Sequence, residues 1–207
     1  MNRLPEGVRL HRGFFDAEAQ IALAREIASV IAAAPLYTST MPKTGAPMSV
    51  RMTNCGALGW YSDKSGGYRY EPRHPLTGEP WPPIPPTLLS AWTRLTGYAP
   101  PPQACLVNVY EPEARMGLHQ DRDEKDFDAP ILSVSLGADC RFRVGGKKRS
   151  DGATAFVLSS GDALVLGGEA RLCFHGVDRI LPTLPPPLPP ELLAGGARIN
   201  LTLRRVT

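Results

Sequence analysis

Residues 104–124 read ACLVNVYEPEARMGLHQDRDE, and this stretch opens the half of the chain that decides the fold. It starts with a short run of β-branched and aromatic residues, and six comparable runs follow it: ILSVSLG, CRFRV, TAFVL, DALVLG, RLCFH and RINLTLR. Such runs, separated by turn residues, are typical of strands. Seven strands in the second half of the chain predict a mainly β fold, either a sandwich or a barrel.

The first half of the chain predicts two helices. Asp16 stands in the position of a helix N-cap, and apolar residues recur at helical spacing from residue 17 until Pro35. A second helix is expected in TLLSAWTRLTGY, ending near Gly97. Residues 40–85 look irregular, and we read the Pro-rich segment 181–196 as a long loop before the last strand.

Composition limits the class of protein without deciding its function. A chain of 207 residues with 43% hydrophobic residues can bury one core, and a net charge of +3 is too small to indicate non-specific nucleic-acid binding. The four cysteines are widely separated, which favours reduced thiols over a disulfide framework. Because no apolar run approaches the roughly 20 residues that span a bilayer, and the N-terminus lacks a signal-peptide pattern, we expect a cytoplasmic protein.

Three residues are candidates for binding a metal ion. His119 and Asp121 are two residues apart, so in an extended segment both side chains leave from the same face. His175, at the end of the run RLCFH, can supply a third ligand if the intervening strands fold back across a barrel. Two imidazoles and one carboxylate on one face of iron(II) leave three positions open, which suit a bidentate oxo-acid and dioxygen. Taken singly, a histidine near a strand end is more often hydrogen-bonded than metal-bound, and a zinc hydrolase can use the same ligands.

The last run, RINLTLR, carries polar side chains on one face. Arg198, Asn200 and Arg204 alternate with apolar residues, which fits either a solvated strand face or a site that binds a dicarboxylate through fixed guanidinium groups. Asn108 and Tyr110 share a face in LVNVY by the same rule and can add neutral donors. A zinc hydrolase would not need these arginines.

The chain resembles the AlkB family of alkylation-repair dioxygenases over most of its length. The resemblance rests on six blocks in order: MSVRMTNCGALGW, ACLVNVYEPEARMGLHQDRDE, APILSVSLG, FRVGGKKR, GDALVLGGEARLCFHG and RINLTLR. It implies a double-stranded β-helix, or jelly roll, with N-terminal helices and a nucleotide-recognition lid. We therefore expect one dioxygenase domain over 1–207, with a helical extension and lid region in 1–104 and the jelly-roll core in 105–207.

The resemblance also implies roles for individual residues. The family's iron ligands match His119, Asp121 and His175, and its 2-oxoglutarate-binding residues match Asn108, Tyr110, Arg198, Asn200 and Arg204.

Substrate recognition is expected at a further group of residues. Asp123 matches the position that recognises the damaged base in relatives, and a carboxylate there would favour a base made cationic by N-methylation. Trp60 resembles the residue that stacks on an extruded base, and Tyr68 and Tyr70 lie in the same glycine-containing stretch. Arg149, in the basic turn GGKKRSDG, matches a nucleic-acid contact in relatives.

These expectations define an enzyme that uses Fe(II), 2-oxoglutarate and O2. It would oxidatively demethylate N-alkylated bases such as 1-methyladenine and 3-methylcytosine in DNA, releasing formaldehyde while 2-oxoglutarate is decarboxylated. We expect a monomer that prefers single-stranded DNA, with double-stranded DNA or RNA as alternatives. A non-catalytic jelly roll that only binds nucleic acid is the competing hypothesis from another class.

Overall fold

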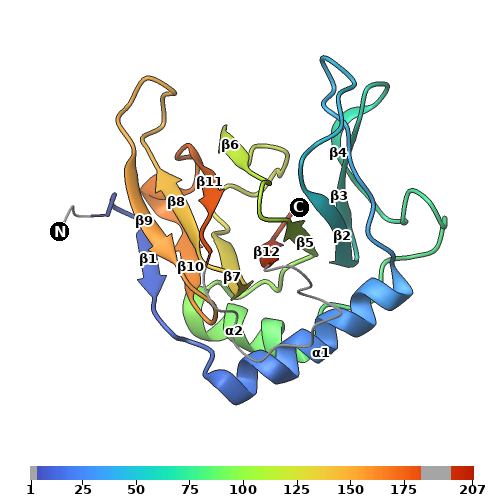
Figure 1. The fold of residues 1–207 in the computed structure, drawn as a ribbon, viewed down its shortest axis with the longest axis horizontal. Coiled ribbons are helices and arrows are strands. Elements are labelled where there is room, and N and C mark those ends of the chain that lie inside the picture. The colour runs from blue at the N-terminus through green and yellow to red at the C-terminus, as the bar shows by residue number, and fades with distance from the viewer. Residues whose placement is uncertain (1–3, 183–196) are drawn as a thin grey trace.

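The computed structural model describes residues 4–182 and 197–207, which form two antiparallel sheets braced by two α-helices (Figure 1). The major sheet has the order β1-β10-β7-β12-β5-β2, made of β1 (Val8–His11), β2 (Arg51–Gly56), β5 (Ala104–Tyr110), β7 (Ile131–Gly137), β10 (Ala163–Leu166) and β12 (Arg198–Arg204). The minor sheet has the order β6-β11-β8-β9, made of β6 (Met116–His119), β8 (Cys140–Val144), β9 (Thr154–Leu158) and β11 (His175–Ile180). A separate hairpin joins β3 (Gly59–Asp63) to β4 (Gly67–Glu71).

The two helices cover the outer face of the major sheet (Figure 1). Helix α1 (Ala17–Ala33) begins where the Asp16 carboxylate accepts a hydrogen bond from the Ala19 N–H at 2.9 Å. Helix α2 (Pro86–Thr96) ends at Gly97, whose φ of 66° suits a left-handed C-cap. Apolar side chains of both helices pack against alternate residues of β5, β7, β10 and β12, so the two sequence-predicted helices are confirmed.

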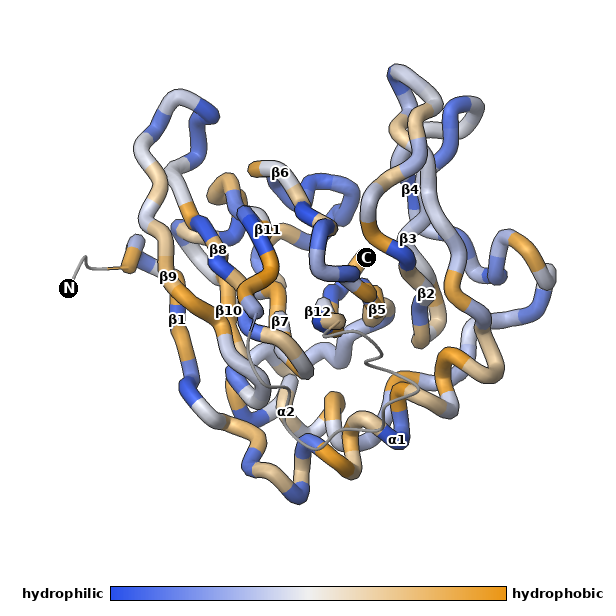
Figure 2. Tube along the Cα trace, in the orientation of Figure 1, coloured by the Kyte–Doolittle hydropathy of each residue, from blue (hydrophilic) through white to orange (hydrophobic). Residues whose placement is uncertain are grey.

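A second core lies between the two sheets. Apolar side chains of the inner faces of β7, β8 and β10 meet there, and this interior also receives the polar face of β12. Figure 2 shows hydrophobic residues concentrated along the sheet strands and a hydrophilic connection between β8 and β9. Since β12 pairs with β5 on one side and β7 on the other, its polar side chains are held in fixed register at the centre of the molecule.

The strands are not confined to the second half of the chain. β1 pairs with β10 and β2 pairs with β5, so the sheet expected in residues 105–207 takes two strands from residues 1–104. The segment 40–85, which looked irregular, contains β2 and the β3–β4 hairpin. These strands are short and polar, and their pairing depends on partners distant in sequence, so local patterning did not mark them.

The run RLCFH was expected to be a strand ending at His175, and that prediction is wrong. A 3-10 turn (Gly168–Ala170) precedes Arg171, and His175 begins β11 instead of ending a strand. The short strand β6, which carries His119, was also missing from the predicted strands.

Other sequence predictions have mixed outcomes. All four cysteines are buried with free thiols. Within residues 4–182 and 197–207, no helix is both long enough and apolar enough to pass through a membrane. Most of the predicted Pro-rich loop, residues 183–196, lies outside the described residues.

Candidate active site

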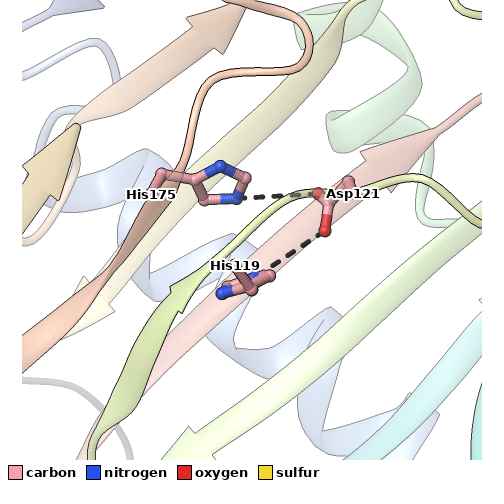
Figure 3. A group of neighbouring side chains, drawn as sticks. All are labelled: His119, Asp121 and His175. Atoms are coloured by element: carbon pink, nitrogen blue, oxygen red, sulfur yellow. Dashed lines mark ion pairs between the residues drawn. The ribbon is translucent and has the colours of Figure 1, made fainter. Parts of the chain in front are cut away.

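His119, Asp121 and His175 converge at one point between the two sheets (Figure 3). His119 ends β6 and His175 begins β11, and the two residues are cross-strand partners whose ring centroids lie 4.6 Å apart. The Asp121 carboxylate lies between them, 3.6 Å from His119 Nε2 through Oδ1 and 3.7 Å from His175 Nε2 through Oδ2. The three ligand atoms are within 4.8 Å of one another, so they can bind one ion.

Each imidazole ring is oriented by a contact between its Nδ1 atom and a backbone carbonyl. His119 Nδ1 lies 2.9 Å from the Gly117 carbonyl, and His175 Nδ1 lies 3.0 Å from the Cys173 carbonyl. Because a carbonyl only accepts, each Nδ1 must carry a proton and donate it, and in a neutral imidazole the free lone pair is then on Nε2. Those Nε2 atoms face Asp121, which is the arrangement found where histidines ligate a metal.

The charge state of the buried ligands also fits a metal. Burial raises the pKa of Asp121, but the Arg204 guanidinium and the two histidines outweigh that effect and hold the pKa well below its usual range. Burial, together with the neighbouring His119, lowers the pKa of His175 to about 4. At neutral pH the set therefore includes an ionised carboxylate and a neutral His175 imidazole, the deprotonated ligands that metal binding requires.

A cavity of about 740 Å³ opens beside these ligands. Its walls include most of the residues predicted from sequence to bind metal, 2-oxoglutarate or substrate: His119, Asp121, His175, Asn108, Tyr110, Asn200, Arg204, Trp60, Tyr68, Asp123 and Arg149. Two of the predicted site residues, Arg198 and Tyr70, do not line it.

Arg204 is the guanidinium closest to the metal ligands. Its Nε and Nη2 donate to Asp121 Oδ2 at 3.2 and 2.9 Å, and its Nε also lies 3.4 Å from Glu124 Oε1. Its Nη1 is buried and has no hydrogen-bond partner within residues 4–182 and 197–207. A buried donor without an acceptor is costly, so an anion that occupied the cavity would restore its missing bond.

Arg198 is fully buried and does not line the cavity. Its Nη2 donates to Ser135 Oγ at 2.7 Å and its Nη1 to the Ala138 carbonyl at 3.3 Å, while its Nε has no partner. The oxygen of the Asn108 amide is also buried and unpaired, and a turned amide would present its NH2 group instead. Of these two arginines, Arg204 lines the cavity and carries the unpaired Nη1, whereas Arg198 does not line it.

The rim of the cavity is formed by the β3–β4 hairpin and by the segment after β6. The Trp60 indole N–H donates to Asp123 Oδ2 at 2.7 Å, and the Trp60 ring stacks on Tyr68 with centroids 5.6 Å apart. The Trp60 backbone is fixed as well, since its carbonyl accepts from Tyr37 and Asn54. Met52 and Met48 pack in the same cluster as Trp60.

Tyr70 and Arg149 differ in their relation to the cavity. The Tyr70 hydroxyl donates a hydrogen bond to Glu124 Oε1, and Tyr70 is not among the residues that line the cavity. Arg149 lies at the rim, with its guanidinium 4.9 Å from the centroid of the Phe174 ring. Lys147, in the same turn, pairs with Glu169 at 2.6 Å.

Comparisons with known proteins decide the family. A family model described as the 2OG-Fe(II) oxygenase superfamily matches residues 7–204. A protein of Caulobacter vibrioides named "Alpha-ketoglutarate-dependent dioxygenase AlkB homolog" is 52% identical over 193 residues, covering 93% of this chain and 84% of that protein. The chain belongs to the AlkB family. An Escherichia coli member, "Alpha-ketoglutarate-dependent dioxygenase AlkB", is 42% identical over 202 residues, covering 96% of this chain and 89% of that protein.

A solved structure agrees with this family assignment. "The structure of OsALKBH1" superposes with a TM-score of 0.75 at 30% sequence identity, covering 99% of this chain and all of that one. The predicted AlkB resemblance, the jelly-roll fold class and the Fe(II)/2-oxoglutarate dioxygenase class are confirmed. The prediction that the chain uses Fe(II), 2-oxoglutarate and O2 is confirmed as well. The roles of individual residues stay predictions.

Sequence reasoning missed two buried charged residues beside the site. Glu124 is 5% exposed and connects Tyr70, Arg204 and Arg171 through its two carboxylate oxygens. Arg171 is 2% exposed and lies outside the cavity wall. Glu124 carries no local signal, because a charged residue next to other charged residues in a loop usually faces solvent. Arg171 was missed because a lone arginine at the start of a predicted strand does not reveal its distant acceptors.

Acidification is expected to destabilise the metal-free chain through His175. The unfolded state takes up a proton on this imidazole near its ordinary pKa of 6.5, whereas the folded state does so only near 4. The free energy of unfolding should therefore fall as the pH drops from about 6.5 to about 4, by up to about 3 kcal/mol. Urea denaturation of the wild type and of His175→Gln at pH 7 and pH 4.5 would measure it. An equal loss in both proteins would contradict this origin.

Proposed function

We propose that the chain oxidatively removes alkyl groups from damaged nucleic-acid bases, and that DNA is its main substrate. The observation that supports this most directly is one cavity that carries both the His119, Asp121 and His175 ligand set and an unpaired Arg204 donor. A zinc hydrolase needs no buried guanidinium group aimed at a second anion beside the metal. A jelly roll that only binds nucleic acid would need neither feature.

When bound, iron(II), 2-oxoglutarate and dioxygen supply the oxidation of an N-methyl carbon, yielding succinate, carbon dioxide and formaldehyde. The chain's own residues hold the reactants. The two histidines and Asp121 would hold the ion, and the cavity beside them would take the other reactants. Arg204 would pair with the dicarboxylate, and Asn108, Tyr110 and Asn200 line the same cavity. Arg198 does not line it, so its positive charge would act from behind the cavity wall.

The rest of the cavity suits a flat, cationic ligand. Trp60 and Tyr68 provide an aromatic surface at the rim, where stacking is worth about 1–3 kcal/mol per base. Asp123 lies beside them, and its carboxylate would favour a base that methylation on a ring nitrogen has made cationic, such as 1-methyladenine or 3-methylcytosine. Apolar side chains of Ile131 and Leu164 complete the walls and exclude water from the reaction.

We further propose single-stranded DNA as the preferred form, with Arg149 contacting a backbone phosphate at the rim. Reaction on RNA is the second candidate, because a relative in Schizosaccharomyces pombe that matches half of this chain is named a tRNA demethylase. The free, buried thiols suit a reducing compartment, so we place the protein in the cytoplasm. We expect it to act as a monomer, which light scattering after size-exclusion chromatography would test.

The proposed reaction can be tested directly. The chain would be incubated with iron(II), 2-oxoglutarate and oligonucleotides that carry 1-methyladenine or 3-methylcytosine in single-stranded DNA, duplex DNA or RNA. Mass spectrometry should show loss of the methyl group, with equal amounts of succinate and formaldehyde. Succinate formation without loss of any adduct would mean that the oxidation acts on another substrate. If no succinate forms with any oligonucleotide, the competing hypothesis of a non-catalytic jelly roll that only binds nucleic acid is favoured.

Trp60→Ala is expected to weaken binding of the methylated oligonucleotide by about 1–3 kcal/mol, the value of one stacked base. The affinity for 2-oxoglutarate should not change, because the Trp60 side chain contacts Asp123 and Tyr68 and, within the described residues, hydrogen-bonds to no arginine. Fluorescence anisotropy of a labelled oligonucleotide and the KM for 2-oxoglutarate would measure the two effects. The opposite order of losses would contradict the stacking role.

Trp60→Phe is the matched variant, because it keeps an aromatic ring, smaller than the indole, and removes the N–H group that holds Asp123. We expect it to retain most of the oligonucleotide affinity and to discriminate less between methylated and unmethylated bases. If Trp60→Phe binds as weakly as Trp60→Ala, the indole N–H contributes more than the stacked ring.

A further inference from the structure

Arg171 is a buried charge that the proposed reaction does not use. It follows the 3-10 turn between β10 and β11, is 2% exposed and does not line the cavity. Phe127 covers its guanidinium at 5.4 Å from the ring centroid. Burying a guanidinium group is costly, and an apolar side chain of similar size is often tolerated better in such a place. The contacts that satisfy it should therefore indicate its role.

All three groups that accept hydrogen bonds from Arg171 belong to one segment, the connection between β6 and β7. Its Nη1 donates to the main-chain carbonyl of Asp121 at 2.9 Å, and its Nε donates to the Ala129 carbonyl at 2.8 Å. Its Nη2 donates to Glu124 Oε2 at 3.1 Å. A planar guanidinium group can reach three acceptors at once because its donors leave in fixed directions, which the single ammonium group of a lysine cannot reproduce.

The segment held in this way carries the chemistry of the site. Residues 120–130 form no helix or strand, so no regular ladder of hydrogen bonds fixes their backbone. Within them lie the metal ligand Asp121, the rim carboxylate Asp123 and the buried Glu124. The other oxygen of Glu124 contacts the Tyr70 hydroxyl and lies 3.4 Å from Arg204 Nε. Arg171 therefore contacts the backbone of the metal ligand Asp121 and the carboxylate of Glu124. Glu124 in turn lies beside Arg204.

We propose that Arg171 is a positioning residue of the metal centre: through Asp121 and Glu124 it fixes the ligand segment in the geometry that binds the ion. This inference rests on the proposed iron-dependent function. Residues that orient metal ligands typically change metal affinity or activity by about 10–100-fold when replaced. Arg171 touches neither the ion position nor the cavity, so its effect must pass through the groups it holds.

Arg171→Lys tests the proposal, because it keeps the positive charge and loses the three-way contact. We expect the dissociation constant for Co²⁺, used as a spectroscopic probe of the empty chain, to rise about 10–100-fold. The visible absorption band of bound Co²⁺ should also change shape, since the Asp121 ligand would be less well fixed. A residue with only a structural role would lower the unfolding midpoint without altering the Co²⁺ affinity or spectrum of the folded protein.

Arg12→Lys is the matched control. Arg12 also donates to a backbone carbonyl and a carboxylate, Val157 at 2.6 Å and Asp162 at 2.7 Å, but it does not line the cavity. We expect it to bind Co²⁺ with wild-type affinity and spectrum. Wild-type Co²⁺ affinity and spectrum in folded Arg171→Lys would overturn the proposal.

A second variant keeps the proposal testable if Arg171→Lys does not fold. Arg171→Met combined with Glu124→Gln removes both members of the buried ion pair, an exchange that proteins often tolerate. It should fold and still bind Co²⁺ at least tenfold more weakly, as expected on loss of an orienting contact, whereas unchanged affinity would overturn the proposal. If the wild-type chain itself fails to bind Co²⁺, the metal centre and the proposed function fail, which is a different result from failure of the Arg171 inference.

Discussion

His119→Ala is expected to reduce formaldehyde release from a 1-methyladenine oligonucleotide to background while the protein remains folded. His119 supplies one of three ligand atoms grouped within 4.8 Å, and two remaining ligands cannot hold the ion in the same geometry. The side chain is 39% exposed and its ring nitrogens contact only the Gly117 carbonyl and Asp121, so its removal leaves no large cavity in the core. Formaldehyde release at saturating iron(II), together with the circular dichroism spectrum, would measure both parts of the expectation.

His119→Ala tests the metal centre more cleanly than Asp121→Ala does. Asp121 is buried and pairs with Arg204, so Asp121→Ala would also leave a buried guanidinium group without its main partner. His11→Ala is a matched control, because His11 lies on β1 and does not line the cavity. It should retain wild-type activity. Full activity in His119→Ala would remove the three-residue metal centre from the account of this chain.

Patterns of period two along the chain predicted much of the site. Alternation in RINLTLR placed Arg198, Asn200 and Arg204 on one face, and the structure places this face between the two sheets. The spacing of His119 and Asp121 predicted that both side chains leave together, which they do. These predictions succeeded because the geometry of an extended strand is set locally by the backbone.

Features that depend on partners distant in sequence could not be predicted. The alternation in RINLTLR does not reveal that Arg198 is buried without lining the cavity and donates to Ser135, a residue of the neighbouring strand. Tyr70 was expected to contact substrate because of its aromatic ring, and its direction toward Glu124 follows from how the β3–β4 hairpin meets the segment after β6. Arg171 illustrates the same limit, since its three acceptors lie more than forty residues away. Registers and loop paths of this kind are decided by the whole packed structure.

Arg204→Ala is expected to cause the second largest loss, in the affinity for 2-oxoglutarate. Its Nη1 is a buried donor without a partner, so the carboxylate that fills the cavity gains a charge-assisted hydrogen bond there. Removing one partner of a buried, hydrogen-bonded charge pair typically costs about 2–5 kcal/mol. The KM for 2-oxoglutarate, measured by succinate formation, should rise accordingly, and an unchanged apparent affinity would refute the assignment.

Arg204→Lys distinguishes the effect of Arg204 on Asp121 from its effect on 2-oxoglutarate. The positive charge of Arg204 helps to hold the pKa of Asp121 low, and a lysine would preserve that charge while losing the forked donors. We therefore expect Arg204→Lys to keep most of the Co²⁺ affinity but to show weakened 2-oxoglutarate binding, whereas Arg204→Ala should lose both. Arg205→Ala is the control, because that neighbouring arginine donates to the Pro101 carbonyl and does not line the cavity. Equal losses of metal affinity in Arg204→Lys and Arg204→Ala would mean that the fork geometry, and not the charge, supports Asp121.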